Sequence, residues 1–314
     1  MPAPATSLYN SALHRFLVLV AFVTFLLLIA GALVTSNDAG LSVPDWPTSF
    51  GSLYKIPPLV GGVKYEHSHR MVAELVGLLT IAAAFWVWRY ERRGWMRKLG
   101  WIALAGVIVQ GVLGGLTVKL LLPWYISSAH AVVAQSFFCL IVLMALFTTQ
   151  SWISDPPPPA DDSGKPSLFV LCLVSLLALY LQLFFGAAFR HGGMSVMYHV
   201  LNSLVVTGLL IWTSVRGMML GREVPALKRP ARLVHGLLMI QIALGVAAYL
   251  TRVVWGKDAP QPLPSMVAST VAHVGVGALL LAVTFVLTLQ ARRYLAVNSR
   301  AGAQQPAQRS GATA

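Results

Sequence analysis

Eight long apolar stretches, separated by short polar segments, dominate the pattern of residues along the chain. Each stretch reaches the roughly 20 residues that an α-helix needs to cross about 30 Å of hydrocarbon. The stretches alternate too weakly for membrane β-strands, and a backbone in lipid must satisfy its own hydrogen bonds. We therefore predict an all-α membrane protein with eight transmembrane helices, over residues 16–35, 69–88, 99–118, 127–147, 167–187, 196–215, 233–251 and 266–289.

Composition agrees with this pattern and excludes a water-soluble fold. The chain has 314 residues, of which 57% are hydrophobic and 11% are charged, whereas soluble domains carry roughly 25% charged residues. In a soluble protein the net charge of +13 would raise the question of nucleic acid binding. Here the basic residues cluster between apolar stretches, so we expect membrane lipid around the chain and no nucleic acid partner.

The distribution of basic residues predicts the orientation of the helices. Of the Lys and Arg residues, 16 fall on the side of the N-terminus and 7 on the other side. Because loops rich in Lys and Arg stay in the cytoplasm, both termini are expected there. We predict a protein of the bacterial cytoplasmic (inner) membrane.

The two halves of the chain resemble copies of one four-helix unit, which predicts two pseudo-symmetric four-helix bundles. Gly31-Ala32 corresponds to Gly186-Ala187, and the segment Gln110 to Gly114 resembles the segment Gln241 to Gly245. Chance similarity between apolar helices is the alternative. The predicted parts are an N-terminal half, a proline-rich linker, a C-terminal half and a disordered cytoplasmic tail, at 1–155, 156–166, 167–295 and 296–314.

Four histidines are the strongest candidates for chemistry. His69, His130, His199 and His273 lie in the first turns of the even-numbered helices, so they should share one depth near the outer face. Polar side chains within a membrane span usually face the interior of the bundle or a ligand. The second and fourth helices of each unit run in the same direction and can face each other diagonally, which would pair the histidines within each half.

Such a pair suits haem better than zinc. Two imidazoles from facing helices are a common axial ligand set for haem iron. Zinc sites take three or four protein ligands. Two histidines per half therefore favour one porphyrin in each half.

Three charged residues extend the candidate sites. Glu66 stands three residues before His69, so the two would share a helix face, and the carboxylate could steer a proton or stabilise positive charge. The alternative is that Glu66 only complements the helix N-terminus. Arg70 could pair with a haem propionate or with Glu66. Arg190 could reach a propionate or act as a plain interfacial anchor, and His67 is expected at the interface.

The first outer loop, residues 37–47, is rich in turn-forming residues and contains one aromatic residue, Trp46. It is either a lid over the site in the first half or an ordinary connection with Trp46 at the membrane interface.

Three motifs together resemble the haem A synthase family. They are Gly40-Leu41-Ser42-Val43-Pro44-Asp45-Trp46-Pro47, Glu66-His67-Ser68-His69-Arg70-Met71 and Gln110-Gly111-Val112-Leu113-Gly114-Gly115-Leu116-Thr117-Val118. The likeness covers nearly all of the chain and is most specific in the first half. It implies an enzyme that oxidises the C8 methyl group of haem O to a formyl group through hydroxylated intermediates, which yields haem A for terminal oxidases.

The resemblance also assigns roles to residues. It implies that His69 and His130 are ligands or contacts of haem O, with Glu66 as the catalytic carboxylate. It further implies that His199 and His273 are axial ligands of a resident haem b. The sequence departs from part of the family because the first outer loop has no cysteine pair, so no disulfide-dependent step is expected in that loop.

Two other functions remain open at this point. A dihaem b-type cytochrome that only transfers electrons would also use two histidine pairs, and only the carboxylate at Glu66 argues against it. A transporter built from repeats would place its polar residues near the midplane, whereas here they cluster near one face. The electron acceptor is unassigned, haem O synthase is a candidate partner for direct transfer, and both a monomer and a homo-oligomer fit the lipid-facing residues.

Overall fold

A computed structural model describes residues 9–53 and 55–296, and within them the chain forms eight long helices. The shortest has 23 residues, which at 1.5 Å per residue is about 35 Å and enough to cross the hydrocarbon core. The bounds are α1 Ser11–Ser36, α2 Val63–Tyr90, α3 Gly94–Lys119, α4 Trp124–Phe147, α6 Leu168–Arg190, α7 Val196–Leu220, α8 Pro225–Tyr249 and α9 Pro264–Tyr294. The prediction of an all-α membrane protein with eight spans is confirmed.

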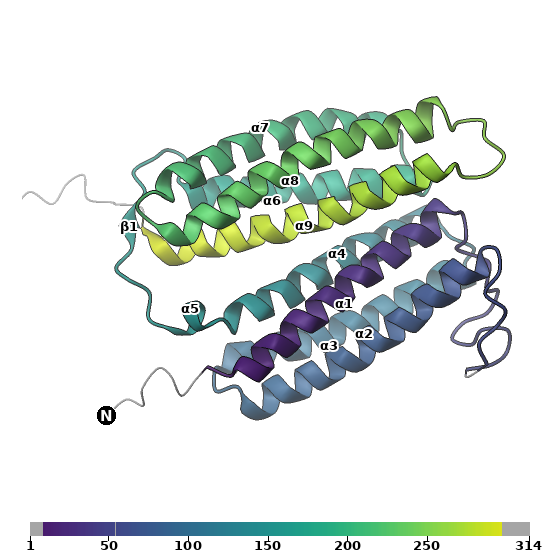
Figure 1. Cartoon of the computed structure of the whole chain (residues 1–314), viewed down its shortest axis with the longest axis horizontal. Coiled ribbons are helices and arrows are strands. Elements are labelled where there is room, and N and C mark those ends of the chain that lie inside the picture. Colours follow the sequence, from purple (N-terminus) through teal and green to yellow (C-terminus); the bar gives the residue numbers. More distant parts are fainter. Residues whose placement is uncertain (1–8, 54, 297–314) are drawn as a thin grey trace, which may run out of the picture.

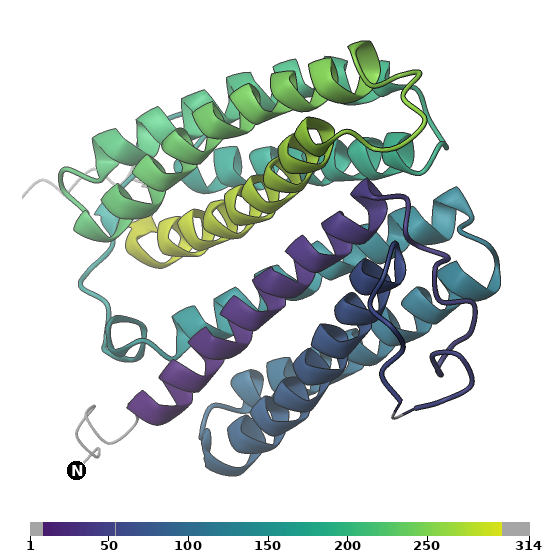
Figure 2. The same cartoon turned by 45° about the vertical axis from the view of Figure 1, so that its right-hand side comes forward.

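The long helices form two groups of four, which Figure 1 shows as a purple and blue bundle of α1 to α4 and a green and yellow bundle of α6 to α9. The groups meet where α1 and α4 pack against α6 and α9, and the view in Figure 2 shows α1 and α9 facing each other across this boundary. The rings of Phe25 in α1 and Phe138 in α4 lie 5.8 Å apart there. A Cβ built on Gly275 would come within 2.7 Å of Ile29, so the glycine allows the close approach of α9 to α1.

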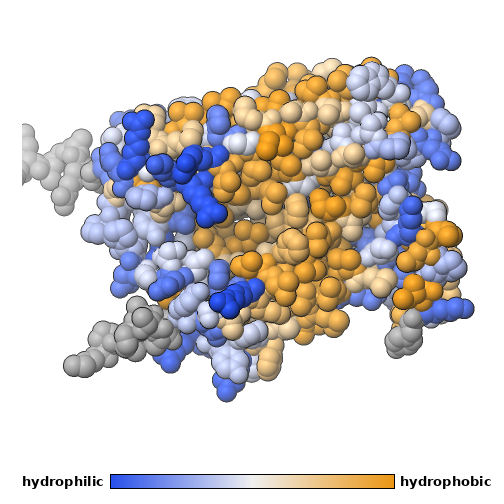
Figure 3. All heavy atoms as spheres, viewed as in Figure 1, coloured by the Kyte–Doolittle hydropathy of each residue, from blue (hydrophilic) through white to orange (hydrophobic). Residues whose placement is uncertain are grey.

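The face of the molecule seen in Figure 3 has a broad apolar band across the middle of the helices, with polar side chains toward both ends. Large apolar side chains such as Phe22, Leu78 and Leu204 are more than half exposed. A water-soluble protein would not leave this many large apolar side chains uncovered. The band is the surface that lipid would cover.

The shorter elements lie at the helix ends. The helix α5 (Gln150–Ile153) follows α4, and the π-helical turn η2 (Leu250–Val254) ends α8. The strands β1 (Ala160–Asp161) and β2 (Leu295–Ala296) pair in parallel. The side chain of Arg216 bonds the buried carboxylate of Asp162, which also accepts a 2.6 Å hydrogen bond from Leu168 N–H.

These contacts refine the expectations for the linker and the tail. The proline-rich segment 156–166 joins the halves, but it is tied to α7 and to the end of α9 rather than being a free linker. Residue 296, the first of the predicted disordered tail, lies in β2. Residues 297–314, which make up the rest of that tail, lie outside the described part of the chain.

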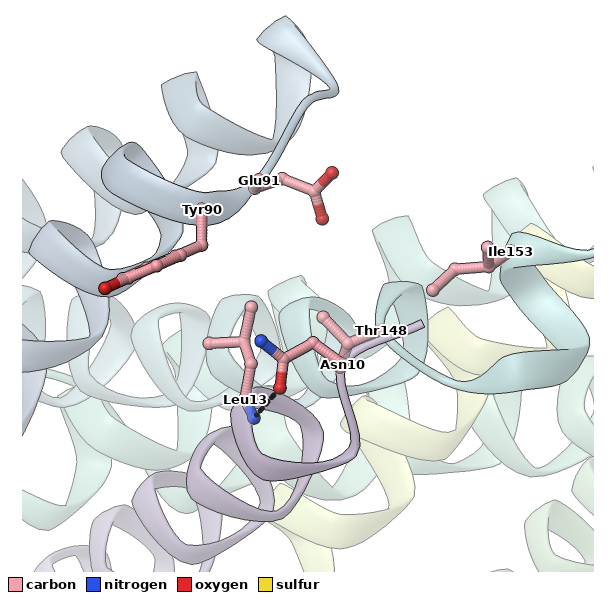
Figure 4. A pocket seen from close by; sticks show the side chains of 6 residues that line it. All are labelled: Asn10, Leu13, Tyr90, Glu91, Thr148 and Ile153. Atoms are coloured by element: carbon pink, nitrogen blue, oxygen red, sulfur yellow. Dashed lines mark hydrogen bonds between the residues drawn. The ribbon is translucent and has the colours of Figure 1, made fainter. Parts of the chain in front are cut away.

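The end of the molecule at which α1 begins contains a small pocket (Figure 4). There Asn10 caps α1, because its Oδ1 accepts a 3.0 Å hydrogen bond from Leu13 N–H. The pocket also touches Tyr90 and Glu91 at the end of α2 and has a volume of about 20 Å³. That is room for roughly one water molecule, so this pocket is not a site for an organic ligand.

Candidate functional site

Each of the four candidate histidines packs against a glycine of the preceding long helix. A Cβ built on that glycine would lie 2.9 to 3.3 Å from Cε1 of the histidine, which is closer than carbon atoms normally approach. The glycines therefore form cradles that accept the imidazole rings and that any larger residue would fill. The pairs are Gly31 with His69, Gly114 with His130, Gly186 with His199, and Gly245 with His273.

The structure brings the rings of the second pair of histidines close together. The ring centroids of His199 in α7 and His273 in α9 lie 6.1 Å apart, with an angle of 76° between the ring planes. Two metal–nitrogen bonds of about 2 Å each, together with the distance from each nitrogen to its ring centre, span a similar length. The separation of these rings therefore suits one metal ion bound between them.

The first pair also shares the interior of its bundle. His69 in α2 and His130 in α4 are close enough to interact electrostatically, and Nδ1 of each ring is buried without a hydrogen-bond partner among the described residues. A buried imidazole nitrogen with no partner is costly. Such nitrogens are expected where a ligand or an ordered water completes the site.

The donor set fits a haem rather than a bare metal ion. Among residues 9–53 and 55–296, no three His, Cys, Asp or Glu side chains gather in a group that could hold a metal. Zinc would need at least three protein ligands. A porphyrin supplies four nitrogens of its own, so a pair of histidines completes its coordination.

Two glutamines contact the histidines of the second bundle, and the sequence did not predict them as site residues. In α6, Gln182 Nε2 lies 3.2 Å from His199 Nε2 and donates a 3.0 Å hydrogen bond to the His199 carbonyl. Its Oε1 accepts a 2.8 Å bond from Asn202 Nδ2, and its carbonyl oxygen lies 3.0 Å from His199 Nδ1. In α8, Gln241 Nε2 lies 3.3 Å from His273 Nε2. Gln110 and Gln241 occupy corresponding positions in the two halves of the sequence. The sequence does not show which helices are neighbours, so it does not predict these contacts.

Glu66 and Arg70 form a buried ion pair at the start of α2. Glu66 is 4% exposed, and its Oε1 accepts a 2.6 Å hydrogen bond from Arg70 Nη2. Its Oε2 accepts a 2.8 Å bond from the N–H of Val43. Of the two partners considered for Arg70, the structure shows Glu66.

The same pair holds the α1–α2 loop, residues 37–62, in place. Arg70 donates hydrogen bonds of 2.7, 3.0 and 3.1 Å to the carbonyl oxygens of Asp45, Thr48 and Val43. His67 was expected at the interface, but it is only 9% exposed because its Nδ1 contacts Ser49 Oγ at 3.1 Å. The loop is therefore folded down onto α2 at the end that carries the histidines.

Trp46 extends this loop over the neighbouring helix. A Cβ built on Gly115 in α3 would lie 2.6 Å from the Trp46 ring, so the indole occupies the space above that glycine. Asp45 orders the turn that follows it. Hydrogen bonds from the Thr48 hydroxyl and from the N–H groups of Gly51 and Phe50 lower the pKa of Asp45 from 3.8 to about 2. Of the two interpretations of the loop, its contacts favour a lid.

Arg190 lies at the junction of the two bundles. Its Nη2 donates a 2.7 Å hydrogen bond to Ser36 Oγ at the end of α1, and Ser36 in turn contacts Thr270 of α9 at 2.9 Å. Its Nη1 is buried and has no partner in the described part of the chain. A buried guanidinium with a free donor is suited to bind a carboxylate. Burial, and then the charge of Arg190, lowers the pKa of the adjacent His191 to about 4.

Part of the chain, which includes three of the four candidate histidines, is similar to known proteins. Residues 63–202 match the model of the COX15-CtaA family, described as cytochrome oxidase assembly protein. A relative named heme A synthase from Shouchella clausii is 30% identical over 188 residues, covering 58% of this chain and 60% of the relative. Relatives with the same name from Lysinibacillus sphaericus and Shewanella oneidensis are 29% and 28% identical, covering 60% and 52% of this chain and 61% and 52% of the relatives.

The chain thus spans about three fifths, or less, of the length of these curated relatives. The matched segment contains three of the four histidines together with Glu66 and Arg70. The resemblance seen in the sequence is confirmed, because residues 63–202 are similar to the COX15-CtaA family of cytochrome oxidase assembly proteins and the relatives carry the name heme A synthase.

Proposed function

We propose that the chain is a haem A synthase, a membrane oxidoreductase that converts the C8 methyl group of haem O into the formyl group of haem A. The observation that carries this proposal is that each bundle holds two histidines in glycine cradles, and that the rings of His199 and His273 lie 6.1 Å apart. It agrees with the name of the relatives, heme A synthase. The conversion runs from methyl to hydroxymethyl to a geminal diol, which loses water to give the aldehyde; each of the two hydroxylations is a two-electron oxidation that draws on an oxidant from outside the chain.

The two bundles take different parts in this proposal. His69 and His130 would hold haem O in the first bundle, beneath the α1–α2 loop. His199 and His273 would hold a resident haem b in the second bundle, and that group supplies one-electron transfer when it is bound. Arg190, with its free Nη1 at the junction, would bind a propionate.

Glu66 is proposed as the catalytic carboxylate of the first bundle. It precedes His69 by three residues on one helix, so both side chains lie on the same face of α2. Arg70 and the Val43 N–H fix its two oxygens. A carboxylate held in this way can stabilise positive charge that develops on a neighbouring substrate, or accept a proton from it, without first having to reorganise.

Replacing Glu66 by glutamine tests this role. We expect cells that carry Glu66→Gln to lose haem A while the purified protein still binds haem, and Glu74→Gln to behave as the wild type. Glu74 is a matched control because it lies on the same helix but is exposed. Limited proteolysis of the α1–α2 loop in both variants separates a loss of chemistry from an opened loop. Normal haem A in Glu66→Gln cells would refute the assignment.

A dihaem b-type cytochrome is the second candidate, because both bundles present histidines in the same glycine cradle. The two functions differ in what happens to added haem O. A synthase forms hydroxymethyl and formyl products from it, whereas a cytochrome only changes its oxidation state. In either case His199→Ala or His273→Ala should abolish the low-spin absorption of the second bundle. Purified wild-type protein without haem would refute both functions.

The proposed setting is the inner membrane of a bacterium, with both termini in the cytoplasm and the histidines toward the outer face. Haem O and haem A are hydrophobic, so direct transfer from haem O synthase is part of the proposal. Failure to crosslink the two proteins in membranes would count against that transfer.

A further inference from the structure

The connection between α7 and α8 forms a groove at the end of the molecule where α1 begins. The groove has a volume of about 390 Å³, which lies in the range of roughly 300–1,000 Å³ typical of sites for organic ligands. The pocket of Figure 4, at the same end of the first bundle, has only about 20 Å³. Half of the residues that line the groove are apolar and half are basic, namely Val215, Met218, Met219, Arg222, Lys228 and Arg232.

The two helices supply walls of different character. Met218 and Met219 follow Val215 by three and four residues, so the three side chains share one face of α7. This wall is accessible, because Val215 is 41% and Met219 62% exposed. Lys228 and Arg232 lie four residues apart on one face of α8. The groove therefore offers apolar surface on α7 beside positive charge on α8.

The three basic side chains of the groove, those of Arg222, Lys228 and Arg232, are exposed. Among residues 9–53 and 55–296, none of them forms an ion pair or a side-chain hydrogen bond. Figure 3 shows hydrophilic side chains gathered at the left ends of α7 and α8, next to the apolar band. Unpaired positive charge of this density attracts an anion.

The corresponding connection of the first bundle, between α2 and α3, uses its arginines differently. Arg93 forms an ion pair with Glu91 at 2.6 Å and donates a 2.9 Å hydrogen bond to the Phe147 carbonyl. Arg97 donates a 2.7 Å bond to the Glu91 carbonyl. Positive charge that only sets the orientation of the helices would be satisfied by either arrangement. Of the two connections, only the one in the second bundle combines unpaired charge with a groove of this size.

Two glycines hold the end of α7 against the start of α8. A Cβ built on Gly217 would lie 2.9 Å from Cβ of Ala231, and one built on Gly221 would lie 2.8 Å from Cα of Lys228. Such close approaches fix the two helices relative to each other. The walls of the groove are therefore in place before a ligand binds, which lowers the entropic cost of binding.

We propose that this groove binds an anionic phospholipid of the surrounding bilayer, with the phosphate at the three basic side chains and an acyl chain along the apolar wall on α7. A guanidinium can hold a phosphate through two parallel hydrogen bonds, and methionine side chains adapt to irregular apolar partners. The groove lies where the apolar spans end, and basic pockets between transmembrane helices bind lipid headgroups at this level. A free phosphate would leave the apolar wall uncovered. The inference goes beyond the proposed function and does not depend on it.

The test compares two triple variants of the full-length protein in an uncharged detergent. The groove variant carries Arg222→Gln, Lys228→Gln and Arg232→Gln. The matched control removes the same charge from the same end of the first bundle, where the side chains are exposed but do not line the groove. It carries Arg89→Gln, Arg92→Gln and Lys98→Gln.

A further variant, Arg222→Lys with Arg232→Lys, keeps the charge of the groove. Native mass spectrometry with added phosphatidylglycerol or phosphatidylcholine gives the dissociation constant of each lipid. Circular dichroism checks that all variants keep the helix content of the wild type.

We expect the wild type to bind phosphatidylglycerol about 10-fold or more tightly than phosphatidylcholine. Each basic residue near an anionic lipid contributes about fivefold to binding, so the groove variant should bind phosphatidylglycerol about 10- to 100-fold more weakly. The control should stay within about threefold of the wild type, and the lysine variant should keep most of the affinity.

Equal losses in the two triple variants would overturn the inference, because the groove would then act only as general surface charge. Equal affinity of the wild type for the two lipids would also overturn it. Complete displacement of phosphatidylglycerol by millimolar inorganic phosphate would show a plain anion site instead of a lipid site. Haem binding and haem A formation enter none of these measurements, so failure of the proposed function would leave the lipid site standing, and the reverse holds as well.

Discussion

Replacing Gly186 by alanine should weaken haem binding in the second bundle, because there is no room for a methyl group beside His199. The new Cβ would lie 2.9 Å from Cε1 and 3.0 Å from Nδ1 of that ring. Carbon atoms in contact stay about 3.5–4.0 Å apart, so the ring must move by roughly 0.5–1 Å. The carbonyl of Gln182, one turn earlier on the same helix as Gly186, lies 3.0 Å from Nδ1, and this contact is lost when the ring moves away from α6.

Overpacking of this kind costs about 1–3 kcal/mol, which corresponds to roughly 5- to 150-fold weaker haem binding if the cost falls on the ligand geometry. The control is Gly208→Ala in α7, where a Cβ meets nothing within 4 Å. The same change there should stabilise the helix by about 0.5–1 kcal/mol. The assay is the haem absorbance per protein after purification, together with the rate of transfer to apomyoglobin. Equal haem content and equal transfer rates in both variants would refute the cradle.

Two further predictions concern the α1–α2 loop. Gly115→Ala should displace Trp46 and speed proteolytic cleavage of the loop. Gly111→Ala, on the same helix, is the control, because a Cβ there meets nothing within 4 Å and cleavage should stay as in the wild type. Equal cleavage of the two variants would contradict the packing of Trp46 on Gly115. The pKa of Asp45 is lowered to about 2, chiefly by the hydrogen bond from Thr48, so its contribution to loop stability is complete above the ordinary value of 3.8 and is lost as the pH falls toward 2. The cleavage pattern should therefore stay constant from about pH 8 to 5 and change only in stronger acid, and a change near neutral pH would show that another group controls the loop.

The eight helices could be predicted because apolar stretches of this length have few other structures in lipid. Their ends could not, since helices continue beyond the apolar residues into charged ones. The helix α8 begins at Pro225 and includes Lys228, Arg229 and Arg232, whereas the apolar stretch suggested a start at 233. Proline suits the first turn of a helix, where its missing N–H is not needed.

The candidate histidines could also be predicted, because a polar residue at one depth in four helices is conspicuous. Their partners could not be assigned from the sequence alone. Gly186 and Gln241 lie in segments that are similar in the two halves. A glycine in such a segment indicates only close helix packing until the neighbouring helix is known. The contact of Arg216 with Asp162 joins residues 54 positions apart, which the local pattern of a proline-rich segment does not reveal.

The two bundles share a backbone plan and differ in the side chains near the histidines. Both place histidines in glycine cradles, so the repeat by itself would give two equal haem sites. The first bundle adds an ion pair of Glu66 with Arg70 and a loop held down by that pair. This loop covers the end of α2 that carries His69, and the second bundle has no counterpart of the Glu66–Arg70 ion pair among the described residues. A fixed carboxylate beside one histidine is suited to a chemical step, whereas electron transfer alone does not need it, and for this reason the proposal assigns the chemistry to the first bundle.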